Sequence, residues 1–378
     1  MARDINQRLK SLQARRQGTD RLAKLGQDSA LEILAKSFTP ESYVKRAPSQ
    51  SFTRYALGAM QAVDPEYTRI SLEEAERVGG QLERRLSTYN ISVALRLQGS
   101  VPCNIHIRGV SDVDLLVLDD RFFTYDTTGR LAGAGYYRNP VPYTPLSALV
   151  QLRSVSERIL RDAYPAADVD ARGSKAINIS GGSLRRPVDV VPSHWYNTLD
   201  YQASLDETDR GVMILDKSVP TSILNMPFRH IQRISQRDTE CFEGLKKAIR
   251  LCKHVKADAV EEGTNISISS FDIASTLWHA DRMGLCAGVI DELSILAETT
   301  RFLDYLARNL SEAQKLWVPD GTRKIFDSTQ KLNGLIQFSL ELDDLALQVA
   351  REHNQMVGIF APQNEDVQRT LKGTRIPQ

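Results

Sequence analysis

The chain has 378 residues, of which 42% are apolar and 25% charged, a composition typical of a soluble globular protein with one large or two ordinary domains. The formal net charge of +1 excludes a global electrostatic attraction to nucleic acid or to an anionic membrane surface. No apolar run is long enough to span a membrane, the first residues lack the apolar core of a secretion signal, and the cysteines form no zinc motif. We therefore expect a cytoplasmic protein with reduced thiols at Cys103, Cys241, Cys252 and Cys286.

Residues 1–70 are predicted to form an N-terminal helical segment. Residues 1–27 carry Leu and Ile at helical spacing, and the first 24 residues hold seven basic and two acidic side chains. Such a basic segment can contact phosphate, but we interpret it as a solvated helix face. Prolines at positions 40, 48 and 65 interrupt the chain before residue 71.

Residues 71–227 are predicted to form a catalytic core of mixed α and β structure. Ser71 and Glu74 predict a capping box that opens a helix ending near Ser87. Alternation over Ile91–Leu97 predicts a strand, and residues 113–118 predict a second, buried strand. Residues 129–145 are rich in Gly, Pro and Tyr and predict a surface insertion.

The second half of this core has shorter elements. A helix is predicted from Ser147 to Ala163, followed by strand-like segments at 168–171 and 176–179 and a turn at 180–183. Asp189 then lies among valines in the run Arg-Arg-Pro-Val-Asp-Val-Val-Pro, as expected for a carboxylate that a strand points out of a packed layer.

The remainder is predicted to be helical. Apolar residues recur every three or four positions from residue 228, which predicts a helical domain over 228–360 with later helices near 270–283, 288–315 and 324–355. Residues 361–378 are polar and are predicted to form a loose tail.

Three aspartates carry the strongest chemical signal. Asp112 and Asp114 are two residues apart, so a strand would place both carboxylates on one face. A lone Asp-x-Asp is usually structural, but here a Gly99-Ser100 turn precedes it, a buried strand follows it, and Asp189 supplies a third carboxylate. Carboxylates this close repel each other unless a cation lies between them, and Mg²⁺ prefers such hard oxygen ligands. The pattern predicts a site for two Mg²⁺ ions, with Mn²⁺ as a substitute, that catalyses phosphoryl or nucleotidyl transfer.

These motifs resemble the DNA polymerase β-like nucleotidyltransferases, and within them the cGAS/DncV-like enzymes of bacterial anti-phage (CBASS) signalling. The runs Ile-Arg-Gly-Val-Ser-Asp-Val-Asp-Leu-Leu-Val and Arg-Arg-Pro-Val-Asp-Val-Val-Pro are similar to that group's signatures. The resemblance implies an α+β fold, a mixed sheet packed against a helical lobe. It also implies Asp112, Asp114 and Asp189 as catalytic metal ligands, and a nucleotide-binding set made of Gln98, Gly99, Ser100, Lys253, Ser269, Ser270 and Phe271.

Some of these residues have plainer interpretations. Lys246, Arg250 and Lys253 share one helix face, which is either a phosphate-binding face or a solvated one. Phe271, taken alone, reads as a core aromatic. His106 reads as an incidental loop residue, and Arg108 either contacts phosphate or pairs with an acid.

The predicted function is synthesis of a cyclic di- or trinucleotide messenger from ribonucleoside triphosphates, with release of pyrophosphate. The resemblance implies a monomer that needs neither membrane nor nucleic acid and works with CBASS accessory and effector proteins. Two alternatives stay open. One is an enzyme of the same superfamily that makes a linear oligonucleotide or modifies a small molecule. The other is a catalytically silent nucleic-acid-binding protein, which the basic N-terminus favours and the three intact carboxylates oppose.

Overall fold

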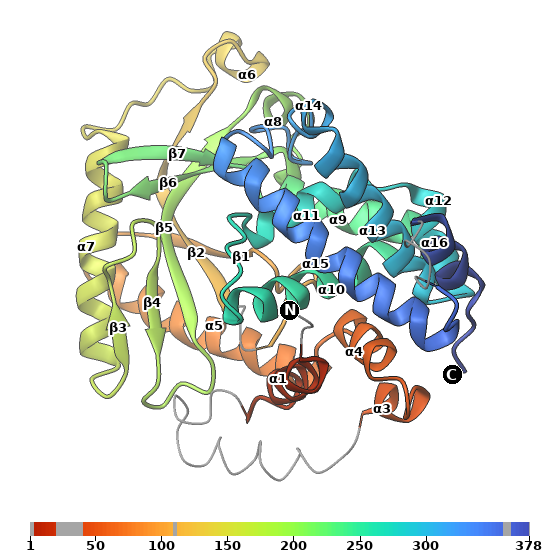
Figure 1. Ribbon diagram of the computed structural model, residues 1–378. Coiled ribbons are helices and arrows are strands. Elements are labelled where there is room, and N and C mark those ends of the chain that lie inside the picture. The colour runs from red at the N-terminus through yellow and green to blue at the C-terminus, as the bar shows by residue number, and fades with distance from the viewer. Residues whose placement is uncertain (1–3, 20–40, 109–111, 358–363, 378) are drawn as a thin grey trace.

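The computed structural model describes residues 4–19, 41–108, 112–357 and 364–377. Seven of its strands form one mixed sheet in which β1, β2, β5, β4 and β3 are neighbours in that order, β6 pairs with β5, and β7 pairs with β6 (Figure 1). Only β2 and β5 run parallel among these pairs. The strands are β1 (Val93–Gln98), β2 (Val113–Tyr125), β3 (Asp168–Asp170), β4 (Ile177–Ser180), β5 (Val188–Asn197), β6 (Gly211–Asp216) and β7 (Thr221–Asn225).

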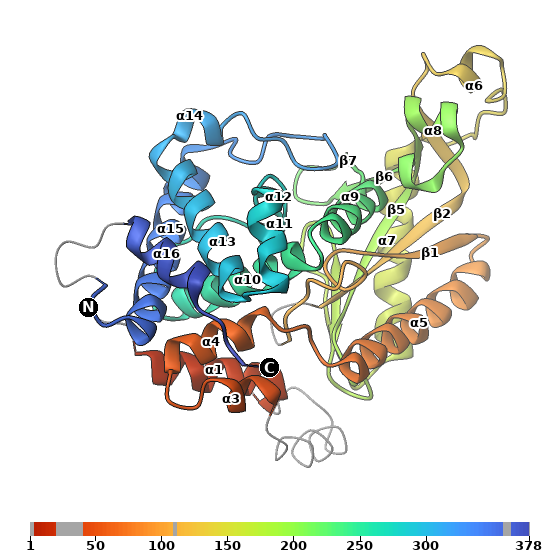
Figure 2. The same ribbon diagram turned by 90° about the vertical axis from the view of Figure 1, so that its right-hand side faces the viewer.

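Two helices cover one face of the sheet. Apolar side chains of α5 (Pro65–Ser87) and α7 (Pro145–Ala163) form a buried cluster with residues of β1, β2, β4 and β5. Val113, Leu115, Val188 and Val190 all belong to this cluster. Because side chains alternate along a strand, the residues between them point to the opposite face, where the helical lobe lies (Figure 2).

The start of α5 differs from the sequence prediction. The Oδ1 atom of Asp64 accepts hydrogen bonds from the backbone N–H groups of Glu66 and Tyr67, and Pro65 occupies the first turn. The predicted capping box at Ser71 is therefore wrong, since Ser71 lies inside the helix and donates to the carbonyl of Tyr67. The Asp-Pro pair is the stronger start signal, because proline fixes its own φ and needs no hydrogen-bond partner.

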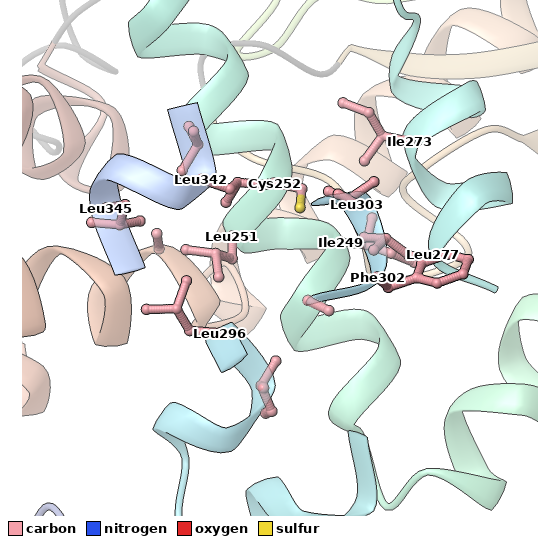
Figure 3. Packing of buried hydrophobic residues seen from close by; sticks show 14 of the residues in the cluster. Ile249, Leu251, Cys252, Ile273, Leu277, Leu296, Phe302, Leu303, Leu342 and Leu345 are labelled. Carbon is pink, nitrogen blue, oxygen red and sulfur yellow. The ribbon is translucent and has the colours of Figure 1, made fainter. Parts of the chain in front are cut away.

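The helical lobe is built around α10. Ile249, Leu251 and Cys252 of this helix pack against side chains of α11, α13 and α15 (Figure 3). The same buried cluster contains Leu12 and Tyr55 from the N-terminal helices. The helices are α1 (Ile5–Gln17), α3 (Ser42–Arg46), α4 (Ser51–Met60), α9 (Pro227–Glu240), α10 (Gly244–Glu261), α11 (Ser270–Leu277), α12 (Arg282–Cys286), α13 (Leu293–Arg308), α14 (Leu310–Ala313), α15 (Thr329–His353) and α16 (Asn364–Gly373).

Shorter elements lie in the connections. They are α6 (Arg130–Gly133), α8 (Leu199–Ser204), η2 (Glu207–Asp209) and η3 (Ala287–Val289). Domain boundaries at residues 70, 227 and 360 stay predictions. No helix within the described residues combines the length and the apolar character needed to cross a membrane.

The basic N-terminal helix is not a solvated face. Arg8 is 4% exposed and pairs with Glu262 and Glu341, while Arg15 is 5% exposed and pairs with Asp258. The predicted helix over 1–27 is confirmed for Ile5–Gln17, and Gly18 ends it in a left-handed conformation with φ +78°. Residues 20–27 lie outside the described residues.

The predicted loose tail is wrong for residues 364–377. These residues form α16 and a short extension, and the helix packs against α13 and α15. Val367 and Leu371 are buried because their spacing of four residues places both on the same helix face. Residues 361–363 and 378 of the predicted tail lie outside the described residues.

Candidate active site

The turn after β1 brings the glycine of the Gly-Ser motif against a carboxylate. Gln98 pairs with Asp114 across the antiparallel β1–β2 ladder, and Gly99 follows with φ +79°. A Cβ built at Gly99 would lie 2.1 Å from the Oδ2 atom of Asp114. Glycine fits here without strain, because it accepts the left-handed conformation and leaves room for the carboxylate where it stands.

The three predicted carboxylates converge on the sheet face opposite α5 and α7. Asp114 and Asp189 are partners in the parallel β2–β5 register, so their side chains lie side by side. The Nδ2 group of Asn178 donates to Asp189 Oδ1 at 2.8 Å and to Asp112 Oδ2 at 3.2 Å. The structure therefore brings Asp114 of β2, Asp189 of β5 and Asp112, the residue just before β2, together, although their role in catalysis stays a prediction.

Electrostatics make this cluster attractive to cations. Burial, followed by the charges of Asp189 and Asp112, raises the pKa of Asp114 to about 7, while Lys253 opposes the shift. Burial also raises the pKa of Asp189, with Asp112 adding to the effect and the Asn178 hydrogen bond opposing it. A divalent cation would relieve this repulsion, and three carboxylates fit the oxygen preference of Mg²⁺.

Protein side chains alone do not form a complete metal site at this carboxylate cluster. Among the described residues, no group of three acidic, histidine or cysteine side chains forms a preassembled metal site. Mg²⁺ commonly takes only one or two carboxylates and completes its shell with water and substrate phosphate. The carboxylate cluster thus fits a metal that arrives with a nucleotide.

Two cations of α10 hold the loop between the Gly-Ser turn and Asp112. Arg250 donates to the carbonyls of Met60 and Asn104, and Lys253 Nζ donates to the carbonyl of Ile105, all at 2.8 Å. Arg250 and Lys253 are only 5% and 3% exposed, so the solvated interpretation is wrong for both. Burial lowers the pKa of Lys253 to about 8, while Cys103 and Asp114 oppose the shift. Lys246, in contrast, is half-buried and pairs with Asp238 at the start of the helix.

The same loop is held from its other side by α5 and α1. His106 is buried, and its Nε2 atom lies 3.0 Å from Thr68 Oγ1. Burial, helped by Lys253 and Arg250, lowers the pKa of His106 to about 4, so this imidazole is neutral near pH 7. Arg108 donates to the Arg16 carbonyl and lies 4.4 Å from the Tyr67 ring centroid. Residues 109–111 of the loop lie outside the described residues.

The predicted Ser-Ser-Phe element opens α11. Ser269 is the N-cap, and its hydroxyl exchanges hydrogen bonds with Asp272 in a capping box. Ser270 is the first helical residue, where backbone N–H groups point out of the helix end. Phe271 is half-buried and stacks on His230 with ring centroids 4.4 Å apart, so it contributes to packing as well as lying at this helix start. Arg323 lies 5.4 Å from the same ring.

One helix connects this element to the carboxylate side. Lys256 Nζ donates to the Ile268 carbonyl, one helical turn beyond Lys253, which binds the Ile105 carbonyl. Lys253 and Lys256 lie on the same face of α10. This face therefore contacts both the loop before Asp112 and the segment that leads into α11. Asn225, just before α9, also donates to Gln98 at 3.2 Å.

Asn178 and Asn225 were missed by sequence reasoning. Asn178 lies in the predicted strand-like segment 176–179, and its position opposite Asp189 depends on strand pairing that no local pattern reveals. Asn225 ends β7, and neither β6 nor β7 was predicted. The short apolar run Val212–Leu215, bounded by Gly211 and Asp216, would have been the available signal for the first of these strands.

A mixed sheet that gathers three carboxylates beside a glycine turn and packs against a helical lobe has the fold of the polymerase β-like nucleotidyltransferases. No protein-family profile matches the chain. Individual proteins do match. A cyclic dinucleotide synthase, CdnE, from Yersinia aleksiciae is 43% identical over 312 residues, covering 82% of this chain and 80% of that protein. A c-di-GMP synthase from Capnocytophaga granulosa is 32% identical over 332 residues, covering 81% of this chain and 90% of that protein.

A solved structure agrees with these sequence matches. The STING-associated CdnE c-di-GMP synthase from Capnocytophaga granulosa has a TM-score of 0.68 and 28% identity, covering 91% of this chain and 97% of its own. The chain belongs to the CdnE family of cyclic dinucleotide synthases, among the cGAS/DncV-like nucleotidyltransferases. It is therefore a nucleotidyltransferase, and the predicted fold class is confirmed.

Proposed function

We propose that this protein is a Mg²⁺-dependent synthase that joins two ribonucleoside triphosphates into a cyclic dinucleotide and releases pyrophosphate. The convergence of Asp112, Asp114 and Asp189 beside the Gly99 turn carries the proposal. The names of the relatives, cyclic dinucleotide synthase and c-di-GMP synthase, support a ring of two nucleotides and GTP as one substrate.

The metal would be held by Asp112, Asp114 and Asp189. When bound, one or two Mg²⁺ ions, or Mn²⁺ in their place, would neutralise charge on the triphosphate and on the departing pyrophosphate. The chain's own contribution is to position the reacting groups and to exclude competing geometries.

The remaining side chains have separate tasks. Asp189 accepts the proton of the attacking ribose hydroxyl. The hydroxyl oxygen bonds to the α-phosphorus of the second nucleotide as the bond from that phosphorus to pyrophosphate breaks. A second attack of the same kind closes the ring.

The triphosphate is bound at two places, one beside the carboxylates and one at the start of α11. Ser100 and Lys253 bind the triphosphate beside the carboxylates, since Lys253 has a pKa of about 8 and is mostly protonated at pH 7. Ser270 adds a hydroxyl at the N-terminus of α11, where an anion is favoured. Gln98, Gly99 and Ser269 shape the pocket, and the Phe271 ring stacks on a base.

The cellular setting is proposed from the resemblance to the cGAS/DncV-like enzymes. We infer that the enzyme works as a cytoplasmic monomer in anti-phage (CBASS) defence and signals to an effector protein through its product. Nucleic acid and membrane are not needed for the reaction described above.

The combined Asp112→Asn and Asp114→Asn variant tests the proposal. Each protein is incubated with ATP, GTP, CTP and UTP plus Mg²⁺, and the products are identified by mass before and after phosphatase treatment. We expect a phosphatase-resistant cyclic dinucleotide from the unmodified chain, none from the double variant, and normal amounts from the control Asp120→Asn, an exposed residue of the same strand. Full activity in the double variant would remove the metal role, and a product with a terminal phosphate would show a linear synthase.

A further inference from the structure

Asn178 occupies the centre of β4, directly beside the carboxylate cluster. It is the register partner of Asp189 in β5 and of Asp170 in β3. Its neighbours Ile177 and Ile179 are both 0% exposed and belong to the core under α5 and α7. Strand alternation therefore turns the Asn178 side chain to the face that carries the aspartates.

The Asn178 side chain can meet the two carboxylates with only one end of its amide group. One Nδ2 group lies 2.8 Å from Asp189 Oδ1 and 3.2 Å from Asp112 Oδ2. A carboxamide NH₂ has two hydrogens, enough for one hydrogen bond to each carboxylate. The carbonyl end of the amide would meet two acceptors at this position, so only the NH₂ end fits between them.

Asp112 differs from the other two aspartates in its place along the backbone. Asp114 and Asp189 lie within β2 and β5, where ladder hydrogen bonds fix the backbone. Asp112 directly precedes the first residue of β2, Val113. The Asn178 amide ties it to a strand residue that is already fixed.

We propose that Asn178 is a positioning residue that holds Asp112 and Asp189 at the separation that a divalent ion requires. This inference rests on the proposed function, since it assumes that the aspartates bind metal. A neutral donor suits the task, because it offsets the repulsion of the carboxylates and leaves their negative charge available to the ion. A lysine here would compete with the metal instead. Partners of this kind contribute about 10–100-fold to metal affinity or activity.

Two variants test the proposal. Asn178→Ala removes the donor, and Ser180→Ala changes the next residue on the same face of the same strand as a control. Each is titrated with Mn²⁺ in two assays. One measures product formation, and the other measures the rise in melting temperature caused by Mn²⁺ with a non-hydrolysable GTP analogue.

We expect Asn178→Ala to need about 10–100-fold more Mn²⁺ for half-maximal effect in both assays. At saturating Mn²⁺ the kcat of Asn178→Ala should return to within a few-fold of normal, which a general folding defect would not allow. Melting temperatures without metal identify any such defect. A metal dependence of Asn178→Ala equal to that of Ser180→Ala would overturn the inference. So would a loss of kcat that Mn²⁺ does not restore. If the unmodified chain itself shows no Mn²⁺ response in either assay, the proposed function fails as well.

Discussion

Replacing Gly99 with alanine should separate the geometry of the carboxylate cluster from the stability of the fold. The new Cβ would lie 2.1 Å from Asp114 Oδ2, whereas ordinary contact begins at 3.4 Å, so the oxygen must retreat by 3.4 − 2.1 = 1.3 Å. A displacement of about 1 Å in a reacting group can cost on the order of 100-fold in rate. That loss corresponds to about 2.7 kcal/mol of transition-state stabilisation.

The cost in stability should be smaller. A left-handed conformation costs a non-glycine residue roughly 1–2 kcal/mol, and Asp114 can yield because it is a side-chain end. Gly263 is a matched control, since its φ is +92° and nothing lies within 4 Å of its Cβ position. Both alanine variants should therefore lose similar free energy of unfolding in urea.

The assay is the initial rate of pyrophosphate release at saturating nucleotide and Mg²⁺. We expect Gly99→Ala to fall about 100-fold and Gly263→Ala to stay near the normal rate. Equal rates in the two variants would refute the reasoning, because they would show that contact with Asp114 does not govern catalysis.

Two further predictions concern the helical lobe. Burial, followed by the charge of Asp304, raises the pKa of Asp343 to about 7, so the folded state holds this proton more tightly than the unfolded state. The resulting stabilisation is complete below about pH 4 and is lost as the pH rises through 7. In Asp343→Asn, the midpoint of urea unfolding should therefore fall less between pH 4 and pH 7 than it does in the unmodified chain. An equal fall in both proteins would contradict the prediction. Leu371 is 0% exposed, so Leu371→Ala should cost about 2–5 kcal/mol of unfolding free energy, against about 0.5 kcal/mol or less for the exposed control Lys372→Ala. A small loss for Leu371→Ala would mean that α16 does not contribute to the core.

The sequence was informative wherever a local pattern determined the outcome. Strand alternation predicted that Asp114 and Asp189 point out of the packed layer, and helical periodicity predicted the lobe after residue 228. Asp112 was expected on the same strand as Asp114 but lies just before it. It was misleading where two local signals competed. Ser71 with Glu74 fits a capping box, yet Asp64 with Pro65 begins the helix earlier.

Long-range contacts account for most of what sequence reasoning missed. The sequence alone suggests that Arg8 and Arg15 are solvated. Their acidic partners lie in α10, just after it, and in α15, more than 240 residues further along the chain. Asn178 becomes significant only when β4 pairs with β5. The tail from residue 364 is polar overall, and the burial of Val367 and Leu371 depends on the packing of α16 against α13 and α15.

The most direct test of the central claim is to locate the metal. Crystals grown with Mn²⁺ and a non-hydrolysable GTP analogue would show the ions through anomalous scattering. We predict peaks bounded by carboxylate oxygens of Asp112, Asp114 and Asp189 and by phosphate oxygens of the analogue. Bound nucleotide with Mn²⁺ placed elsewhere, away from these three side chains, would contradict the account.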